Sequence, residues 1–535
     1  MSPAGSNETS AMASNPADSG LSALPPGPDP HVPVWELTLA DEEATLDLAR
    51  FIADELRPGD VVTLSGGLGA GKTTLARAVI RALAGDPQME VPSPTYTLMQ
   101  IYDGQRCPVV HADFYRIAGP GELLEMGWEE ATESAITLVE WPDRAEEALA
   151  RSRLEITLDM IPPEQGGGRV AIMVGTGAFG ERVTRARALK AMLLRTGWDQ
   201  AERTPMSGDA SSRAYERLTR PDGATAILMI SPRRPDGPAI RMGRSYSDLA
   251  RLAESVHAFV AVDRGLRALN LSAPKIYGED LEIGLLLIED LGPGGVVDAN
   301  GPIPERYAEA AALLAKLHHT PLPHVLPIGD DLEHVIPPYD AQAMLIEVEL
   351  FLDWYLKYRI GTAPSGAARS EFLNAWADAL EPALYGPQSW VLRDYHSPNL
   401  IWLPDREGLA RVGLIDFQDA VIGPPAYDLV SLLQDARIDV PASLEIKLLS
   451  HYCKLRREAD EDFDLPGFTK VYALMGAQRA TKILGIFTRL DIRDGKPGYL
   501  DHIPRIEAYL ARNLEHPALA RLKAWFATHA AGVVE

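Results

Sequence analysis

The most informative part of the chain is residues 391–435, which read VLRDYHSPNLIWLPDREGLARVGLIDFQDAVIGPPAYDLVSLLQD. Asp394 lies five positions before Asn399, and the β-type run 412–415 leads directly into Asp416. A positioned carboxylate can accept a hydroxyl proton, while an amide oxygen and a second carboxylate are ligands for Mg²⁺. This order favours phosphoryl transfer, with Asp394 as the base and Asn399 and Asp416 at the metal. The alternative is a hairpin of two strands with capping acids.

The composition is that of a large, acidic, cysteine-poor protein. It has 535 residues, of which 46% are hydrophobic, and a net charge of −24, so no broad attraction to nucleic acid or to an anionic membrane is expected. The two cysteines, Cys107 and Cys453, exclude a disulfide framework and a cysteine-rich metal site. We find neither an apolar run near 18 residues nor a secretory signal, and therefore expect a cytoplasmic protein without a membrane span.

A glycine-rich loop lies near the start of the chain. The β-type run 60–64 is followed by GGLGAGKT and by a helical run at 75–83. This is the context of a nucleotide-binding P-loop, in which glycines let backbone N–H groups approach phosphate oxygens. Lys72 is expected to reach the outer phosphates of ATP, and Thr73 to ligate Mg²⁺. The predicted nucleotide contacts are Gly66, Gly69, Ala70, Gly71, Lys72, Thr73 and Thr74.

The segment before this loop predicts a strand and a helix. Residues 34–39 read as the strand, and Asp41 can cap a helix that runs to about residue 56. The inner face of that helix is predicted to hold Leu46, Ala49 and either Ile52 or Ala53.

Further motifs in this region resemble a known family. They are SPTYTL at 93–98, HADFYR at 111–116 and LVEWP at 138–142, together with DEEAT at 41–45. They resemble TsaE, the ATPase subunit of the bacterial machinery that makes threonylcarbamoyladenosine on tRNA. The resemblance covers about residues 33–180 and implies a small P-loop domain with a mostly parallel sheet.

The TsaE resemblance also implies site residues. Glu42 and Thr95 would contact the nucleotide, with Thr95 on a switch-like loop near the γ-phosphate. Asp113 and Glu140 would lie at strand ends near Mg²⁺, Glu140 acting in hydrolysis, and Trp141 would flank the site. The apolar run before Glu140 agrees, because it brings a carboxylate to the rim of a parallel sheet, where ligands bind. The alternatives are a helix cap for Asp113 and a core anchor for Trp141.

The charge of this region bears on its partners. Residues 33–185 contain 13 Lys and Arg against 25 Asp and Glu, a net charge of −12. Such a surface should not grip tRNA by itself. The family implies an ATP-driven partner of TsaB and TsaD, which handle the substrate.

The second half begins with short β-type runs. Residues 209–213, beside the runs 215–218 and 225–230, are expected where a kinase small lobe covers the phosphates. The lysine that kinases carry in this lobe is absent, and Met229 stands nearest its place. Arg213 or Arg217 could supply the missing charge. The run 285–289 resembles the hinge strand whose backbone meets adenine.

Residues after Asp416 strengthen a second resemblance. GPPAYDL at 423–429 continues the likeness to the aminoglycoside phosphotransferase-like kinases, in which Asp428 buttresses the catalytic loop. The alternative for Asp428 is a helix N-cap. QRATKILGIFTRL at 478–490 and YLDHIPR at 499–505 resemble one branch, AmgK, which phosphorylates the anomeric hydroxyl of N-acetylmuramate and N-acetylglucosamine in cell-wall recycling.

Several charged residues of this half have two interpretations. Arg479 and Arg489 could meet the carboxylate of muramate, or they could be helix-packing and ion-pair residues. Glu347, Glu349 and Asp353 could face a polar substrate, or they could form the solvated face of an amphipathic helix over 341–356.

The sequence therefore predicts an α/β P-loop NTPase domain followed by a two-lobed α+β protein-kinase-like (aminoglycoside phosphotransferase) domain. The expected divisions are a disordered tail at 1–32, the TsaE-like domain at 33–183, the small lobe and hinge at 184–292, and a helical large lobe at 293–535. ATP and Mg²⁺ would serve both domains, and an amino sugar would be the acceptor. Two alternatives remain for the second domain: a phosphotransferase acting on aminoglycosides or another small molecule, and a non-catalytic pseudokinase.

Overall fold

The computed structural model describes residues 34–206, 213–233, 237–329, 331–361 and 363–533, and the predicted tail at 1–32 lies outside these residues. The chain divides into two compact units, one ending at Arg187 and the other beginning at Ala188.

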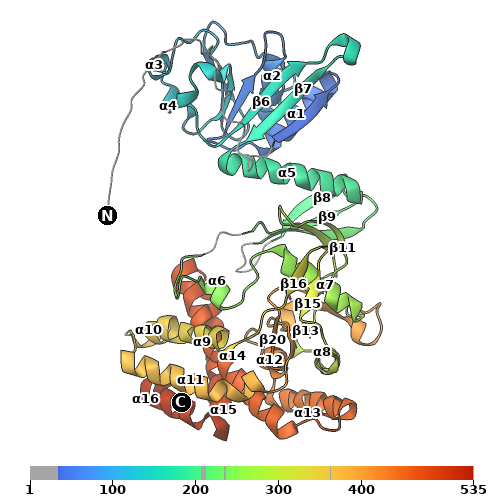
Figure 1. Ribbon diagram of the computed structural model, residues 1–535, viewed down its shortest axis with the longest axis vertical. Helices are drawn as coiled ribbons and strands as arrows, with labels where there is room; N and C mark the ends of the chain where they lie inside the picture. The colour runs from blue at the N-terminus through green and yellow to red at the C-terminus, as the bar shows by residue number, and fades with distance from the viewer. Residues whose placement is uncertain (1–33, 207–212, 234–236, 330, 362, 534–535) are drawn as a thin grey trace, which may run out of the picture. The chain divides into compact units, whose positions relative to one another are not determined.

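Unit 1 is built on a seven-stranded sheet in the order β1-β7-β6-β2-β5-β4-β3. Strands β6 and β7 and helices α1 and α2 are labelled in Figure 1. The central strands β6, β2, β5 and β4 are parallel, whereas β1, β7 and β3 join antiparallel to their neighbours. The expected mostly parallel sheet is therefore wrong for the edges, and the sheet is mixed. The elements are β1 Val34–Leu39, α1 Glu42–Glu55, β2 Val61–Ser65, α2 Lys72–Ala84, β3 Met99–Asp103, β4 Pro108–Asp113, α3 Gly121–Glu125, α4 Trp128–Thr132, β5 Ile136–Glu140, β6 Arg153–Met160, β7 Arg169–Gly175 and α5 Gly177–Thr196.

The inner face of α1 differs from the prediction at one position. Asp41 caps the helix as expected, its Oδ1 accepting the backbone N–H of Ala44 at 2.9 Å. Leu46, however, is 43% exposed, whereas Leu48 is buried. The buried residues of α1 begin at Thr45 and recur at helical spacing through Leu48, Ala49, Ile52 and Ala53. The sequence prediction begins the buried face one residue later and therefore places Leu46 inside.

The first sheet of unit 2 is covered on both faces at its inner strands β10 and β12. Its five strands are all antiparallel, in the order β11-β12-β10-β9-β8. Leu285 and Leu287 of β12 pack in one hydrophobic cluster with Met192 of α5, while Leu286 and Ile288 join the cluster that contains α7. This alternation accounts for the continuous apolar run that predicted the strand. The elements are β8 Glu202–Met206, β9 Ala214–Thr219, β10 Thr225–Ile230, α6 Tyr246–Leu249, α7 Val256–Ala268, β11 Ile276–Asp280 and β12 Leu285–Glu289.

The remainder of unit 2 is mainly helical around one large core. The long helix α14 packs against α9, α11, α12 and α15 (Figure 1). A Cβ on Gly485 of α14 would lie 2.4 Å from the backbone of Leu350, so glycine permits α14 to approach α9 closely. The elements are β13 Val297–Asp298, β14 Gly301–Pro302, α8 Pro304–His319, β15 Val325–Pro327, β16 Glu333–Val335, α9 Ala341–Leu350, a π-helical turn Phe351–Leu356, α10 Lys357–Ile360, α11 Gly366–Tyr385, β17 Ser389–Val391, β18 Leu400–Trp402, β19 Val412–Leu414, β20 Val421–Gly423, α12 Ala426–Leu433, α13 Ala442–Ala459, α14 Leu465–Asp494, α15 Ile503–Leu514 and α16 Ala520–His529.

The helix α5 contributes to both cores. Its first half buries Phe179 and Val183 within unit 1, and its second half buries Leu189 and Met192 within unit 2. A chain cut inside this helix would lose part of one core. Tests of either unit therefore require the whole chain.

Long helices such as α14 contain charged residues throughout. Over the part of the chain that the structure describes, no helix combines the length and the apolar character that crossing a bilayer requires.

The inner face of α1 can be tested with two leucines of the same helix. Leu48→Ala should destabilise unit 1 by about 2–5 kcal/mol, because it empties a buried position. Leu46→Ala should change stability by no more than about 0.5 kcal/mol. Hydrogen exchange of the whole chain, measured on peptides from α1, β1 and β7, reports unit 1 separately. Equal effects of the two substitutions would contradict the observed face.

Candidate active sites

The P-loop of unit 1 has a backbone that only glycine adopts easily. Gly66, Gly69 and Gly71 have φ of 127°, 80° and 104°. A Cβ on Gly66 would lie 2.2 Å from the carbonyl oxygen of Leu158 in β6, so a side chain there would displace the neighbouring strand. The loop is thus held against the sheet while its N–H groups remain at the start of α2, where a helix favours an anion.

Lys72 lies folded into this loop. Its Nζ donates to the carbonyl oxygens of Gly66 and Gly67, both at 2.8 Å, and lies 3.9 Å from the centre of the Trp141 ring. Burial lowers the pKa of Lys72, and the carboxylates of Glu140 and Asp113 oppose that change. The ammonium group is therefore in place beside the loop, on a flank that Trp141 closes.

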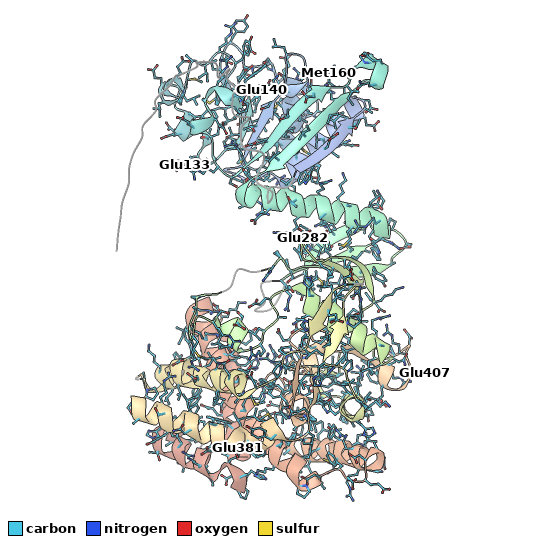
Figure 2. The ribbon with its side chains drawn as sticks, in the orientation of Figure 1. Glu133, Glu140, Met160, Glu282, Glu381 and Glu407 are labelled. Carbon is cyan, nitrogen blue, oxygen red and sulfur yellow. The ribbon has the colours of Figure 1, made fainter. Side chains whose placement is uncertain are left out.

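Two acids meet where the parallel strands β4 and β5 end. Asp113 and Glu140 are paired residues of the two strands, and both are buried. Thr73 Oγ1 donates to Glu140 Oε2 at 2.9 Å, and Thr95 Oγ1 donates to Asp113 Oδ2 at 2.8 Å. The structure thus brings together the predicted metal ligands of this unit (Glu140 is labelled in Figure 2). Asp113 is the last residue of β4 and is the N-cap of none of the helices that the structure describes. Trp141 packs against the hydrophobic cluster around Phe114, as the core-anchor interpretation expects, and also lies over Lys72.

Sequence reasoning missed two residues of this site. Buried His111 places Nε2 3.0 Å from Glu140 Oε1, on the same face of β4 as Asp113. A period of two from Asp113 would have indicated it. Arg169 of β7 donates from Nε to the carbonyl oxygen of Ala70 at 2.8 Å. No local signal marks Arg169, because it comes from a strand 99 residues away.

The remaining predicted contacts of unit 1 are Thr74 and Glu42, for which the structure gives no hydrogen bond to the two acids. Thr74 is half-buried in the first turn of α2. Glu42 is exposed in the first turn of α1 and makes no hydrogen bond or ion pair with the residues that the structure describes. Its nucleotide contact therefore remains a prediction from the family resemblance.

The catalytic loop of unit 2 brings Asp394, Asn399 and Asp416 together. Asn399 Nδ2 donates to the backbone oxygen of Asp394 at 3.0 Å and to Asp416 Oδ2 at 3.3 Å. Strands β18 and β19 pair between these residues and hold the ends of the loop side by side. Arg393 and Asp416 have φ of 66° and 59°, which non-glycine residues seldom adopt, so the surrounding contacts fix their geometry. The side chain of Asp394 is 43% exposed and open to an acceptor.

Charges around Asp394 favour its ionised form. Partial burial raises its pKa, but His396, Lys482 and Arg393 lower it by more, so that the pKa lies below its ordinary value. Burial lowers the pKa of His396 itself to about 4, which leaves that ring neutral at pH 7. Lys482 and Arg393 therefore supply the positive charge near neutrality. In contrast, burial and the charge of Asp394 raise the pKa of Asp416.

Arg213, one of the two candidates for the charge of the missing small-lobe lysine, lies beside the catalytic loop. Its Nη1 lies 3.3 Å from Asp416 Oδ1. Arg217, the other candidate, instead pairs with Asp290 at 2.8 Å, directly after β12. Met229 is buried in β10. Residues 209–212, predicted to cover the phosphates, lie outside the described part of the chain.

Glu347 is a buried centre of charge beneath the catalytic loop. Its carboxylate contacts Arg393 Nη2, lies 2.8 Å from Lys482 Nζ, and accepts Gln478 Nε2 at 3.0 Å. The hydroxyl of Tyr339 donates to the same group. The solvated-face interpretation is thus wrong for Glu347, which is fully buried, because its partners come from distant segments.

The two other acids of the predicted helix 341–356 differ in exposure; Glu349 lies in α9 and Asp353 in the π-helical turn that follows it. Glu349 is also buried, and its carboxylate lies 2.8 Å from Arg241 and 3.1 Å from Arg369. The side chain of Asp353 is 46% exposed and matches the solvated face. Burial of Glu349 again follows from partners that the local pattern does not show.

Asp428 supports the catalytic loop directly. Its carboxylate accepts the backbone N–H of Leu392 at 2.6 Å and that of Arg393 at 2.9 Å. It lies inside α12, for which Pro425 is the N-cap residue, so the helix-cap interpretation is wrong.

Arg479 and Arg489 occupy one face of α14 in different surroundings. Arg479 lines a cavity of about 10 Å³ together with Gln434, the C-cap residue of α12, and Tyr509 of α15. The guanidinium of Arg489 lies 5.0 Å from the centre of the Tyr246 ring.

Neither group of acids is a complete metal cage. Over the described residues, no three His, Cys, Asp or Glu side chains gather as a metal site. The residues nevertheless fit Mg²⁺, which keeps several waters and binds through one or two carboxylates together with substrate phosphates. Thr73, Asp113 and Glu140 would hold it in unit 1, and Asn399 and Asp416 in unit 2.

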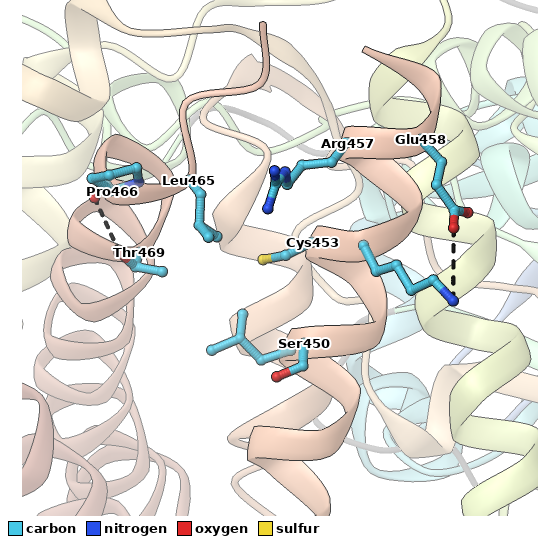
Figure 3. Close-up of a pocket in the computed structure, with 9 residues that line it drawn as sticks. Ser450, Cys453, Arg457, Glu458, Leu465, Pro466 and Thr469 are labelled. Carbon is cyan, nitrogen blue, oxygen red and sulfur yellow. Dashed lines mark hydrogen bonds and ion pairs between the residues drawn. The ribbon is translucent and has the colours of Figure 1, made fainter. Parts of the chain in front are cut away.

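A roomy cavity lies elsewhere in unit 2. It has a volume of about 880 Å³ and lies between α13 and the first turn of α14, around Cys453 and Leu465 (Figure 3). Its lining includes none of the predicted site residues. Volume alone therefore does not locate the chemistry in this chain.

Comparison with known proteins confirms both family resemblances. Residues 39–165 match the family described as threonylcarbamoyl adenosine biosynthesis protein TsaE, and residues 202–463 match the phosphotransferase enzyme family. An N-acetylmuramate/N-acetylglucosamine kinase of Caulobacter vibrioides is 40% identical over 353 residues, which are 64% of this chain and 96% of that protein.

Two further relatives are similar to one part of the chain each. A kinase of the same description from Pseudomonas aeruginosa is 30% identical, over 62% of this chain and 91% of its own length. A tRNA threonylcarbamoyladenosine biosynthesis protein TsaE of Rickettsia conorii is 37% identical, over 23% of this chain and 70% of its own length.

The buried charge centre can be tested by removing its one acid. Glu347→Ala should destabilise unit 2 by about 3–5 kcal/mol, because it leaves Arg393 and Lys482 buried without their carboxylate. Glu381→Ala, at an exposed position of α11 (labelled in Figure 2), is the control and should stay within about 0.5 kcal/mol. Hydrogen exchange in α9 and α14 of the whole chain measures both. A loss from Glu347→Ala no larger than the control would contradict the assigned role.

Proposed function

We propose that this chain, which belongs to both the TsaE family and the phosphotransferase enzyme family, joins two ATP-using enzymes. Unit 1 would hydrolyse ATP in the synthesis of threonylcarbamoyladenosine on tRNA. Unit 2 would transfer a phosphoryl group from ATP to the anomeric hydroxyl of N-acetylmuramate or N-acetylglucosamine. The convergence of Asp394, Asn399 and Asp416 supports phosphoryl transfer. The choice of sugar is supported by the stretches 478–490 and 499–505 and by the relative that is 40% identical.

The proposed transfer assigns each residue of the catalytic loop a task. A sugar hydroxyl is a weak nucleophile, and Asp394 can orient it and accept its proton as the bond to phosphorus develops. Asn399 and Asp416 would hold Mg²⁺, which supplies neutralisation of charge on the phosphate oxygens. Arg213, 3.3 Å from Asp416, adds positive charge on the small-lobe side. Asp428 keeps the backbone before Asp394 in position.

The proposal for unit 1 rests on the acids and hydroxyls around the P-loop. Lys72 would exchange the carbonyl oxygens of Gly66 and Gly67 for phosphate oxygens. Thr95, hydrogen-bonded to Asp113, would contact the nucleotide near its γ-phosphate. Glu140 would help position the attacking water.

The partners of unit 1 are part of the proposal. The family resemblance leads us to expect that TsaB- and TsaD-like proteins bind it. Its net charge of −12 over residues 33–185 gives it little attraction for tRNA by itself, so these partners would handle the tRNA. Since ATP is used by both units, the proposed site of action is the cytoplasm.

Removal of the proposed base tests the kinase assignment. In Asp394→Asn, kcat for sugar phosphorylation should fall by roughly 10²–10⁴-fold while sugar binding changes little, because shape is kept and the base is lost. Asp416→Ala should abolish Mg²⁺-dependent transfer. The measurement is transfer from labelled ATP to N-acetylmuramate, N-acetylglucosamine and an aminoglycoside, with the new phosphate located by NMR.

Lys72→Ala is the matched control for this experiment, because it alters the other nucleotide site and should leave sugar phosphorylation unchanged. Phosphate on the aminoglycoside alone would favour an antibiotic-modifying enzyme. Phosphate on none of the three acceptors would favour a non-catalytic module. Either result would overturn the sugar-kinase proposal.

The ATPase assignment is best tested in a chain whose proposed kinase activity has been removed, because both units would consume ATP. In chains that already carry Asp394→Asn, Lys72→Ala should abolish ATP hydrolysis because phosphate contacts are lost. Glu140→Ala should reduce hydrolysis but preserve nucleotide binding. TsaB- and TsaD-like proteins from the same organism should associate with the parent chain in calorimetry and raise its ATP turnover. Unchanged hydrolysis in both variants, or no association of folded partners, would count against unit 1 having this function.

A further inference from the structure

One face of α14 carries positive charge toward the catalytic loop. Arg479, Lys482 and Arg489 follow one another at intervals of three and seven residues, so they share a face of the helix. Lys482 Nζ lies 2.8 Å from Glu347 and 3.3 Å from the hydroxyl of Tyr427, and its charge helps to lower the pKa of Asp394. This face therefore borders the space in which an acceptor must lie.

Arg489 differs from its neighbours because its charge is not neutralised. Lys482 is paired with Glu347, and Arg493, one turn later, is paired with Asp494 at 2.7 Å. Arg489 makes no ion pair within the described residues, and its buried Nε has no hydrogen-bond partner there. Its guanidinium lies 5.0 Å from the centre of the Tyr246 ring and makes a side-chain hydrogen bond with that neutral residue. Burial and the like charge of Arg493 lower the pKa of Arg489, with Tyr246 and Asp494 opposing, as expected for a cation removed from water.

An anion beside Arg489 would relieve this cost. A charge-assisted bond to a carboxylate is stronger than a neutral one, and the guanidinium presents parallel donors that match two oxygens. Arg479 is the less suitable partner, because the cavity it lines is only about 10 Å³ and faces Gln434 and Tyr509. Along the helix, Arg489 lies about 10 Å beyond Lys482. An acceptor that contacts Arg489 must therefore extend well beyond the hydroxyl that Asp394 orients, as a hexose with a three-carbon ether does.

The two sugars named for the relatives differ in one relevant group. N-acetylmuramate is N-acetylglucosamine with a lactyl ether at carbon 3, and that ether carries a carboxylate. We propose that Arg489 binds this lactyl carboxylate, with Tyr246 fixing the plane of the guanidinium, and so determines the preference for N-acetylmuramate over N-acetylglucosamine. The inference rests on the proposed kinase function of unit 2.

The two sugars provide an internal comparison for the test. In the whole chain, Arg489→Gln should lower kcat/KM for N-acetylmuramate by roughly 10- to 100-fold, as expected for loss of a charged hydrogen bond. The value for N-acetylglucosamine should stay within about twofold, which also shows that the variant is folded. Arg489→Lys should restore part of the loss. Arg493→Gln, the same change on an arginine already paired with Asp494, should leave the ratio of the two values unchanged.

A second measurement begins with the unaltered protein and then uses the variant. With the unaltered protein, the methyl ester of N-acetylmuramate keeps the ether but loses the charge, and its kcat/KM should fall by a similar factor. Arg489→Gln should then no longer distinguish the ester from the acid.

Three results would overturn the assignment to Arg489. One is an equal loss for both sugars in Arg489→Gln, and another is no loss for either. The third is a selective loss of N-acetylmuramate in Arg479→Gln but not in Arg489→Gln. If the unaltered protein phosphorylates neither sugar, the proposed kinase function fails, and this inference fails with it.

Discussion

The carboxylate of Glu347 is withdrawn from water and holds three separate parts of unit 2 together. It comes from α9, while Arg393 belongs to the catalytic loop and Lys482 to α14. Desolvating a carboxylate and two cations is costly, and their mutual attraction offsets that cost only when geometry and hydrogen bonds are good. Tyr339 and Gln478 supply those hydrogen bonds. The position of Asp394, the next residue after Arg393, thus depends on an acid that touches no substrate.

Unit 1 fixes its chemistry in a different way. Its loop is held by backbone geometry, because Gly66 lies where any side chain would strike the carbonyl oxygen of Leu158. Its acids are placed by strand pairing, since Asp113 and Glu140 stand opposite each other in β4 and β5. Unit 2 instead relies on side-chain charge to hold an irregular loop. Substitutions of buried charge should therefore disturb unit 2 more than unit 1.

The sites could be read from the sequence where their residues are close along the chain. The P-loop and the run from Asp394 to Asp416 have fixed spacings, and each chemical group follows from a short pattern. Glu347 could not be read in this way, because its burial depends on partners 46 and 131 residues away. A helical pattern shows only that an acid lies beside apolar residues, not that the opposite face is covered.

The same limit applies to the fold. The strands and helices near the motifs were predicted, but the edges of the first sheet were not, because strand direction depends on distant pairing. On α1, Leu46 and Leu48 are chemically identical, and a stripe read one residue late exchanges the inner and outer positions. Arg169 reaches Ala70 from another strand and left no local signal.

The methionine at position 229 has a consequence for chemical labelling. Reagents that deliver an acyl group from an ATP analogue modify a lysine amine beside the phosphates. In unit 2 the sequence predicts Met229 nearest the place where kinases carry that lysine; this thioether is buried in β10, and a thioether is not acylated. Lys72 of unit 1 retains a reactive amine in its loop. A survey of nucleotide-binding proteins made with such reagents would thus register this chain through its first half and overlook the second.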